Sequence, residues 1–240
     1  MFNQPELLLF IKLVIAHLLT DFGLQNKNWV ADQQKHKMKS KKLYLHVGIT
    51  AIVAYLLSGE WQTWWLPIYV FVIHLAINIW KVYQKKKVVY FVIDQLLHIL
   101  SLVLLVMIWG NRWTEFIVFI KSLLNNSNFL LILAGYITVT YPMGIFIGQL
   151  TQKWQLESKT KENGLAQAGI WIGLLERFLI FTFILMEQYT AIGFLIAAKS
   201  ILRYNDKDFN TQKQTEYVLI GTLMSFASAI ILGLIIKLLF

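Results

Sequence analysis

The chain has 240 residues, of which 57% are hydrophobic and only 15% are charged, and its mean hydropathy is +0.57. A soluble globular domain has about half apolar and a quarter charged residues, so this composition excludes an ordinary soluble domain and favours a membrane protein. The lack of cysteine excludes disulfides and thiolate metal sites. The net charge is +9. Because the lysines lie in short clusters between long apolar runs, we attribute this excess to membrane topology, and we expect no nucleic-acid partner.

Long apolar runs recur along the whole chain. A helix needs about 20 apolar residues to cross a bilayer, and its backbone groups must bond within the segment. The sequence therefore predicts an all-α, polytopic integral membrane protein with about eight transmembrane helices, whose main partner is the lipid bilayer. We place these spans at 6–24, 43–59, 61–82, 88–109, 128–150, 165–187, 189–204 and 216–239.

A shorter apolar run, RWTEFIVFIKSLL at 112–124, is too short to cross the bilayer. Its amphipathic pattern predicts one short interfacial helix. The run lies in the longest external gap between spans, and we use this gap to divide the chain. The expected parts are a four-helix membrane half at 1–110, an external linker at 111–127 and a second membrane half at 128–240.

Lysine and arginine concentrate in alternate loops between the predicted spans. The positive-inside rule places these loops in the cytoplasm, which puts the N-terminus and the C-terminus outside. The basic residues of these loops are Lys27, Lys35, Lys37, Lys39, Lys41, Lys42, Lys81, Lys85, Lys86, Lys87, Lys153, Lys159, Lys161, Arg203, Lys207 and Lys213.

Ionisable side chains inside the first four spans are the main functional signal, because such groups are costly in lipid. Two histidine–aspartate pairs have the four-residue spacing that places both side chains on one helix face. The predicted topology puts the whole set in the cytoplasmic half of the bilayer. The set comprises His17 and Asp21 on the first span, His46 on the second, His74 on the third, and Asp94 and His98 on the fourth.

Imidazole and carboxylate groups together suit a divalent metal ion such as zinc, iron or manganese. The sequence therefore predicts a metal-dependent hydrolase embedded in the membrane, acting on a lipid-linked or small-molecule substrate. In this hypothesis His46 is the catalytic acid or base. The residues that hold or tune the metal are His17, Asp21, His74, Asp94 and His98, and the supporting polar residues are Gln25, Asn78, Lys81 and Gln95.

Two other functions account for the same residues. A proton- or ion-coupled transporter or channel would use them as a relay, with Glu176, Arg177 and Lys199 of the second half as its gate. A structural or sensory protein would use them to hold neighbouring helices together. Glu176 and Arg177 are adjacent and point apart, so each needs a partner on another helix, and Lys199 is the candidate partner for Glu176.

Several segments resemble a known family. AHLLTDFGLQ (16–25), VIHLAIN (72–78) and FVIDQLLH (91–98) are similar to the pattern of the bacterial domain-of-unknown-function family 3307, and IGLLERFLI (172–180) is similar to longer members. The resemblance implies a protein of the bacterial inner membrane without an established activity. It also implies functional polar positions at His17, Asp21, Gln25, His46, His74, Asp94, Gln95 and His98. Asn78 departs from the aspartate expected there, which weakens the case for His74 as part of a ligand pair.

Overall fold

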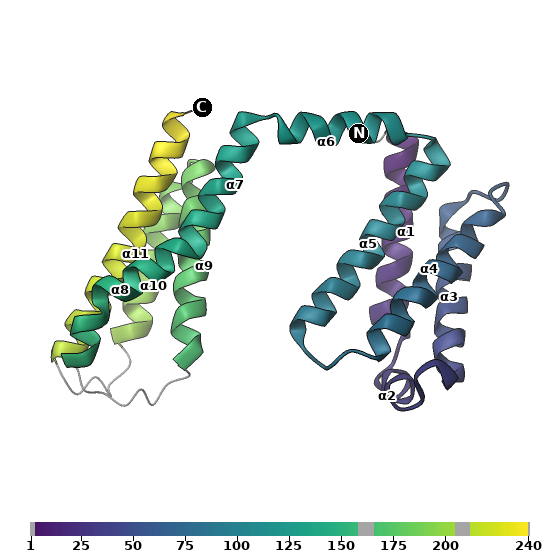
Figure 1. Cartoon of the computed structure of the whole chain (residues 1–240), viewed down its shortest axis with the longest axis horizontal. Helices are drawn as coiled ribbons and strands as arrows, with labels where there is room; N and C mark the ends of the chain where they lie inside the picture. The colour runs from purple at the N-terminus through teal and green to yellow at the C-terminus, as the bar shows by residue number, and fades with distance from the viewer. Residues whose placement is uncertain (1–2, 158–165, 205–211, 240) are drawn as a thin grey trace. The chain divides into compact units, whose positions relative to one another are not determined.

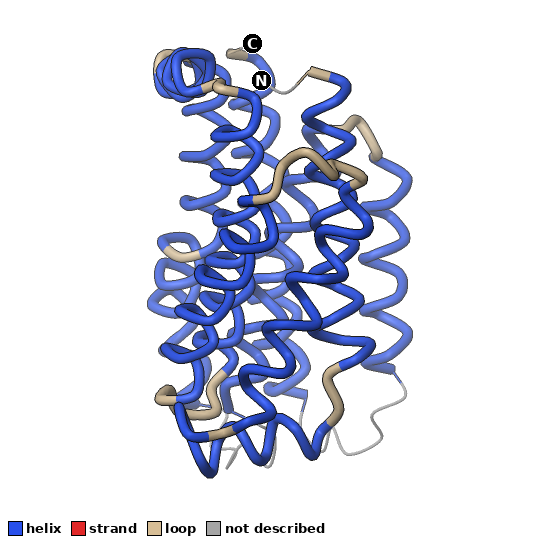
Figure 2. The backbone as a smooth tube through the Cα atoms, turned by 90° about the vertical axis from the view of Figure 1, so that its right-hand side faces the viewer, coloured by secondary structure: helices blue, strands red, loops and turns tan. Residues whose placement is uncertain are grey.

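The structure is a computed structural model that describes residues 3–157, 166–204 and 212–239. The described residues form helices joined by short links and contain no β-strand (Figure 2), which confirms the all-α prediction for this part of the chain. Contacts divide the chain into two compact units, Met1–Ile120 (unit 1) and Lys121–Phe240 (unit 2).

Among the described residues, six helical segments are long and apolar enough to cross a membrane. They are Gln4–Leu24, Trp65–Val82, Val88–Gly110, Ser127–Trp154, Ala168–Leu185 and Leu219–Leu238. The expected number of eight is not confirmed. The predicted spans 43–59 and 189–204 are helical, but the first follows directly on two lysines and contains His46, and the apolar part of the second is only Tyr189–Ile201.

Unit 1 is built around four long helices (Figure 1). They are α1 (Gln4–Leu18), which continues into a π-helical turn η1 (Leu19–Leu24), α3 (Lys41–Ser58), α4 (Trp65–Val82) and α5 (Val88–Gly110). The helices α1 and α4 each contact both α3 and α5, so the four form a closed bundle. Two short elements, α2 (Lys27–His36) and η2 (Lys37–Lys39), lie at the end of the bundle where α3 begins (Figure 1).

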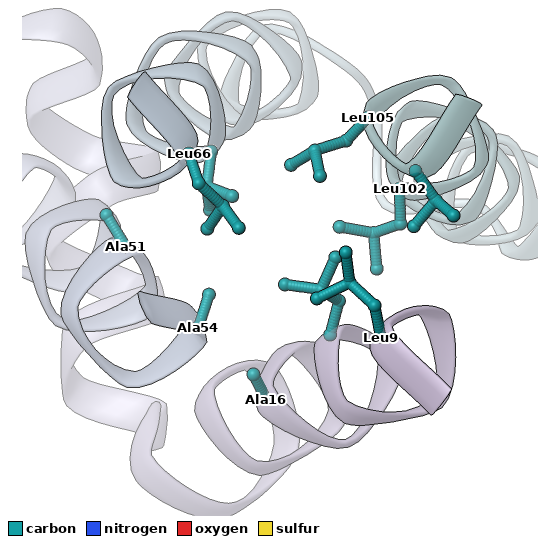
Figure 3. Packing of buried hydrophobic residues seen from close by; sticks show 10 residues of the cluster. Leu9, Ala16, Ala51, Ala54, Leu66, Leu102 and Leu105 are labelled. Atoms are coloured by element: carbon teal, nitrogen blue, oxygen red, sulfur yellow. The ribbon is translucent and has the colours of Figure 1, made fainter. Parts of the chain in front are cut away.

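The apolar core of unit 1 occupies the other end of the bundle. Leucines from three helices, including Leu9, Leu66 and Leu105, meet at its centre (Figure 3). Small residues of α3, Ala51 and Ala54, let this helix pack closely against them. The core residues come from α1 up to Ala16, from the first part of α4 and from the last parts of α3 and α5, so the polar residues toward the opposite helix ends are left in a separate layer.

The ends of the unit 1 helices follow local rules. Ser40 accepts a hydrogen bond from the Leu43 amide and caps the start of α3. Gly59 ends the same helix with φ of 73°, a conformation that favours glycine. Lys12 of α1 also donates to the Ser58 carbonyl at 3.0 Å. A turn follows Gly59, so α4 begins at Trp65 and not at residue 61 as predicted.

The helix α6 (Trp113–Leu124) follows α5 at the position of the predicted interfacial helix. None of its residues is buried. Arg112 bonds Glu6 of α1 and Glu115 of α6, each at 2.7 Å, and so attaches the start of α6 to the start of α1. Glu6 is buried, and its ion pair with Arg112 explains how a carboxylate is tolerated there.

The described residues of unit 2 form five helices, and their buried core includes Phe181, Ile184 and Phe226. The predicted span 128–150 is broken by Pro142, which lacks a backbone N–H. Three basic residues assigned to cytoplasmic loops, Lys159, Lys161 and Lys207, lie outside the described residues. The helices are α7 (Ser127–Thr140), α8 (Pro142–Glu157), α9 (Ala166–Leu185), α10 (Tyr189–Tyr204) and α11 (Gln212–Leu238).

Candidate metal site

Four helical segments of unit 1 bring their histidines and aspartates together in the layer beside the apolar core. We call this set the histidine–aspartate cluster. Every member is buried, and the most exposed, Asp21, has a relative exposure of only 8%. The members are His17 of α1, Asp21 of η1, His46 of α3, His74 of α4, and Asp94 and His98 of α5.

Asp21 lies at the centre of three imidazoles. Its Oδ1 atom is 3.5 Å from His17 Nδ1, 3.4 Å from His74 Nε2 and 3.5 Å from His46 Nε2. Ligand atoms on one tetrahedral zinc ion, at bond lengths of about 2.0–2.1 Å, lie about 3.3 Å apart. The spacing around Asp21 therefore fits atoms that share one small cation.

The potential ligands form two overlapping groups, each with ligand atoms within 4.8 Å of one another. One group is His17, His74 and His98, and the other is Asp21, His46 and His74. The ring of His98 stacks on that of His17 with centroids 4.7 Å apart, and it lies 4.4 Å from the ring of His74. His74 belongs to both groups and joins them into one cluster.

Several polar atoms of the cluster are buried and form no hydrogen bond with the described residues. They are His17 Nδ1, both carboxylate oxygens of Asp21, Asp94 Oδ1 and His98 Nε2. An unbonded polar atom in a protein interior is costly, and native proteins leave few of them. All five are lone-pair atoms of metal-binding residue types, so a bound cation would account for them.

The opposite ring nitrogens of two histidines are already bonded. His17 Nε2 lies 3.2 Å from Gln95 Oε1, and His98 Nδ1 lies 2.8 Å from the Asp94 backbone oxygen. Because a carbonyl oxygen only accepts, each of these nitrogens carries the hydrogen of its ring. The unbonded His17 Nδ1 and His98 Nε2 therefore carry free lone pairs, which is the arrangement of metal-binding histidines.

Asp94 stands apart from the two groups of potential ligands. Its Oδ2 atom lies 2.6 Å from Lys81 Nζ and accepts from Gln95 Nε2 at 2.9 Å. Asp94, Lys81 and Gln95 thus form a connected group, which contacts His17 and His98 at the ring nitrogens opposite the unbonded ones. The sequence predicted Lys81 and Gln95 as supporting residues and Asp94 as a residue that holds or tunes the metal.

The other two supporting residues take part in different contacts. Gln25 donates to Gln33 Oε1 at 3.3 Å, and Asn78 donates to the His74 backbone oxygen at 3.0 Å. Sequence reasoning missed Gln33 of α2, which is buried and donates to the Lys42 carbonyl. Gln33 lies in a lysine-rich segment that lacks an apolar pattern, so no signal marked it as an interior residue.

Asp21 lies in the π-helical turn η1, which sequence reasoning also missed. Thr20 in this turn donates to the backbone oxygens of Ala16 and His17, at 3.0 and 3.1 Å. A π-helical turn is wider than an α-helical turn and is common at functional sites. The turn begins directly after α1 and directs the Asp21 side chain into the bundle.

A small cavity lies beside the histidine–aspartate cluster. His17, His74 and His98 line one part of it, and Thr50, Tyr69 and Ser101 are among its other lining residues. The cavity thus borders His17 and His98, the two imidazoles with an unbonded ring nitrogen.

The polar residues predicted in the second half belong to unit 2 and form their own contacts. Lys199 Nζ lies 2.6 Å from Glu176 Oε2, so Glu176 has the partner suggested by the sequence. Arg177 is buried and donates to the backbone oxygens of Val139 and Thr140 and to Ser225 Oγ. These contacts satisfy carbonyls where α7 ends, next to Pro142.

The comparison with protein families gives a match over about half of the chain. A sequence model described as "Protein of unknown function (DUF3307)" matches residues 9–125. No curated protein and no solved structure matches the chain. The matched segment contains every member of the histidine–aspartate cluster, together with Lys81 and Gln95.

Proposed function

The chain belongs through residues 9–125 to the family DUF3307, whose description states no activity, and from its buried cluster we propose that unit 1 is a metal-dependent hydrolase embedded in the membrane. The observation that carries the proposal is the group of buried ligand atoms around Asp21. Its Oδ1 atom lies 3.5 Å from His17 Nδ1 and 3.4 Å from His74 Nε2, as the ligands of one ion would, and both Asp21 oxygens and His17 Nδ1 form no hydrogen bond with the described residues.

The donor set limits the choice of ion. Three imidazole nitrogens, from His17, His74 and His98, and one carboxylate, from Asp21, suit zinc, iron or manganese. The chain has no cysteine, so a thiolate ligand is excluded. Asp21 would supply the negative charge that offsets part of the charge of a divalent ion.

A divalent ion in this site would supply a Lewis acid that lowers the pKa of a bound water. His46 is our candidate for the catalytic acid or base. Its Nε2 atom lies 3.1 Å from His74 Nε2 and 3.5 Å from Asp21 Oδ1, so it is within reach of a proton at the site. The group of His17, His74 and His98 provides three nitrogen ligands without it.

The surroundings of the cluster suggest the source of the substrate. The lysines of α2, η2 and the link between α4 and α5 lie at the end of unit 1 opposite its apolar core. We infer that this end faces the cytoplasm of a bacterial inner membrane, with the N- and C-termini outside. The site then lies in the inner half of the bilayer, where a lipid-linked or small membrane-derived molecule would reach it.

Elemental analysis tests metal binding. The protein is purified in detergent without added metal, beside a His17→Ala/His98→Ala variant and a His36→Ala variant. His36 is a matched control, because its side chain is 48% exposed and pairs with Asp32 outside the cluster. We expect near-stoichiometric zinc, iron or manganese in the wild type and in His36→Ala, and loss of the metal in the double variant. Lack of metal in every protein, even after zinc, iron and manganese are each added back, would exclude the metal site.

A second experiment tests hydrolysis. The protein is reconstituted into vesicles of phosphatidylethanolamine and phosphatidylglycerol, and released water-soluble products are identified by mass spectrometry. We expect release by the metal-loaded wild type, no release after chelation, and strongly reduced release by His46→Ala with its metal retained. Release that is unaffected by chelation would contradict the proposal.

One observation favours a second candidate, an ion transporter. The two groups that share His74 would give an ion two adjacent positions. Zinc flux into the same vesicles would distinguish the two functions. A transporter requires flux that disappears in the His17→Ala/His98→Ala variant, whereas a hydrolase does not require flux.

A further inference from the structure

A continuous chain of contacts runs from a half-buried lysine to the histidine–aspartate cluster. Lys81 Nζ lies 2.6 Å from Asp94 Oδ2, and Gln95 Nε2 donates to the same oxygen at 2.9 Å. The other end of the Gln95 amide, Oε1, lies 3.2 Å from His17 Nε2. This series of contacts thus links α4 to α5 and α5 to α1 at the level of the cluster.

Each contact in the chain determines the direction of the next one. The carboxylate of Asp94, paired with a lysine ammonium, only accepts hydrogen bonds. The NH₂ group of Gln95 must therefore face Asp94, and its carbonyl oxygen must face His17. Because that oxygen accepts, His17 Nε2 carries the ring hydrogen, and the lone pair is on Nδ1, the atom 3.5 Å from Asp21 Oδ1.

From this series of contacts we propose that Lys81 and Gln95 are positioning residues. They select the tautomer of His17 and so direct its Nδ1 lone pair toward the cluster. The consequence for metal binding rests on the proposed function, whereas the tautomer itself is a property of the metal-free protein. With the other tautomer, a hydrogen on Nδ1 would block His17 as a ligand.

Lys81 is suited to this role by its position at the edge of the bundle. Its side chain is 31% exposed, whereas that of Asp94 is fully buried. Loss of the ammonium would remove little packing but would leave the Asp94 carboxylate without its cation. The Gln95 amide would then no longer be held in one orientation, and the hydrogen of His17 could be on either nitrogen.

The first part of the test measures zinc affinity in detergent. We expect Lys81→Met and Gln95→Leu each to weaken zinc binding by about 10- to 100-fold, as is typical when a residue that orients a metal ligand is lost. Lys81→Arg keeps the positive charge and should restore most of the affinity. Lys85→Met is the matched control, because Lys85 is exposed in the link after α4, and its affinity should equal that of the wild type.

The second part reads the tautomer directly without metal. Nitrogen NMR of protein with ¹⁵N-labelled histidine distinguishes the protonated from the unprotonated ring nitrogen, and a His17→Gln variant assigns the His17 signals. We expect hydrogen on Nε2 in the wild type and in Lys81→Arg, and a mixture or the opposite tautomer in Lys81→Met and Gln95→Leu. Thermal unfolding of each variant shows whether it is folded.

The outcomes separate the two proposals. One outcome is a wild type that binds no metal while Lys81→Met and Gln95→Leu still change the tautomer of His17. That result would reject the metal site and retain the positioning role. A folded Lys81→Met and a folded Gln95→Leu with wild-type tautomer would overturn the positioning role, whatever the metal does. If the wild type binds zinc, wild-type zinc affinity in both variants would overturn it as well.

Discussion

At the scale of the residue, the histidine–aspartate cluster is unusual because several of its buried polar atoms form no hydrogen bond with the described residues. Gln95 and the Asp94 backbone bond the outer nitrogens of His17 and His98, while the inner nitrogens and the Asp21 oxygens bond nothing in the described chain. A cluster that served only to hold helices together would be expected to bond these atoms as well, as it does at the 3.1 Å contact between His46 Nε2 and His74 Nε2.

Zinc should therefore stabilise unit 1, and Asp21→Asn should reduce this effect. An ion at about 100 times its dissociation constant adds about 2.7 kcal/mol to the stability of the form that binds it. Thermal unfolding with zinc and with a chelator measures this effect, and an equal zinc shift in both proteins would contradict this prediction.

Arg177 gives a prediction for unit 2. Its guanidinium donates to Val139, Thr140 and Ser225, so Arg177→Leu would leave two buried carbonyls without a donor. We expect a loss of about 2–3 kcal/mol in unfolding free energy. Arg177→Lys should lose a smaller part, because an ammonium keeps the charge but cannot match the fork geometry. Denaturant unfolding in detergent measures the difference. An unfolding free energy of Arg177→Leu equal to that of the wild type would show that these contacts do not stabilise the fold.

At the scale of the element, helix ends and close approaches explain where glycine is needed. Gly59 has a positive φ at the end of α3, and Gly135 of α7 lies against Phe181 and Ile236 in the core of unit 2. Other helical glycines, including Gly48 and Gly148, have open space where a side chain would begin. The same residue type therefore has different roles at different positions.

Gly59→Ala should lower the thermal stability of the protein. An L-residue in the left-handed conformation costs about 1–2 kcal/mol, and the space around Gly59 offers no compensating contact beyond Lys12 Nζ at 3.6 Å. The matched control is Gly48→Ala within α3, which should not destabilise, because alanine is the better helix former. Equal melting temperatures for the two variants would contradict the assigned helix end.

Gly135→Ala should disturb the packing of unit 2. A Cβ atom there would lie 2.3 Å from Phe181 Cζ and 2.5 Å from Ile236 Cδ1, so both side chains would have to move. Such overpacking typically costs about 1–3 kcal/mol. Gly148→Ala is the control, since no atom lies within 4 Å of its added Cβ. Denaturant unfolding should show destabilisation in the first variant only.

At the scale of the whole molecule, composition and loop charge predict how the chain crosses the membrane. The chain has no cysteine, so single cysteines can be placed without background. Lys39 of η2 and Gln62 of the link between α3 and α4 are both exposed and lie beyond opposite ends of α3. They therefore test whether α3 crosses the membrane as the sequence predicts.

A membrane-impermeant maleimide should label Gln62→Cys on intact bacterial cells and should label Lys39→Cys only after the cells are opened. This result is expected because the lysine-rich end should face the cytoplasm. The reverse pattern would invert the orientation, and labelling of both residues on intact cells would contradict a unit 1 that crosses the membrane.

By itself the sequence determined the all-α membrane character, most helix positions and the layer in which the histidines and aspartates gather. These properties depend on apolar length, helical spacing and loop charge, all of which are local. Only the tertiary structure decided that Asp21 lies in a π-helical turn and that the Asp94 backbone oxygen bonds His98 Nδ1. It also decided the contacts of Lys81 with Asp94 and of Arg177 with the end of α7. The physical reason is that hydrogen bonds between helices are directional. Their partners depend on which face each helix presents, and no local pattern in the chain specifies that.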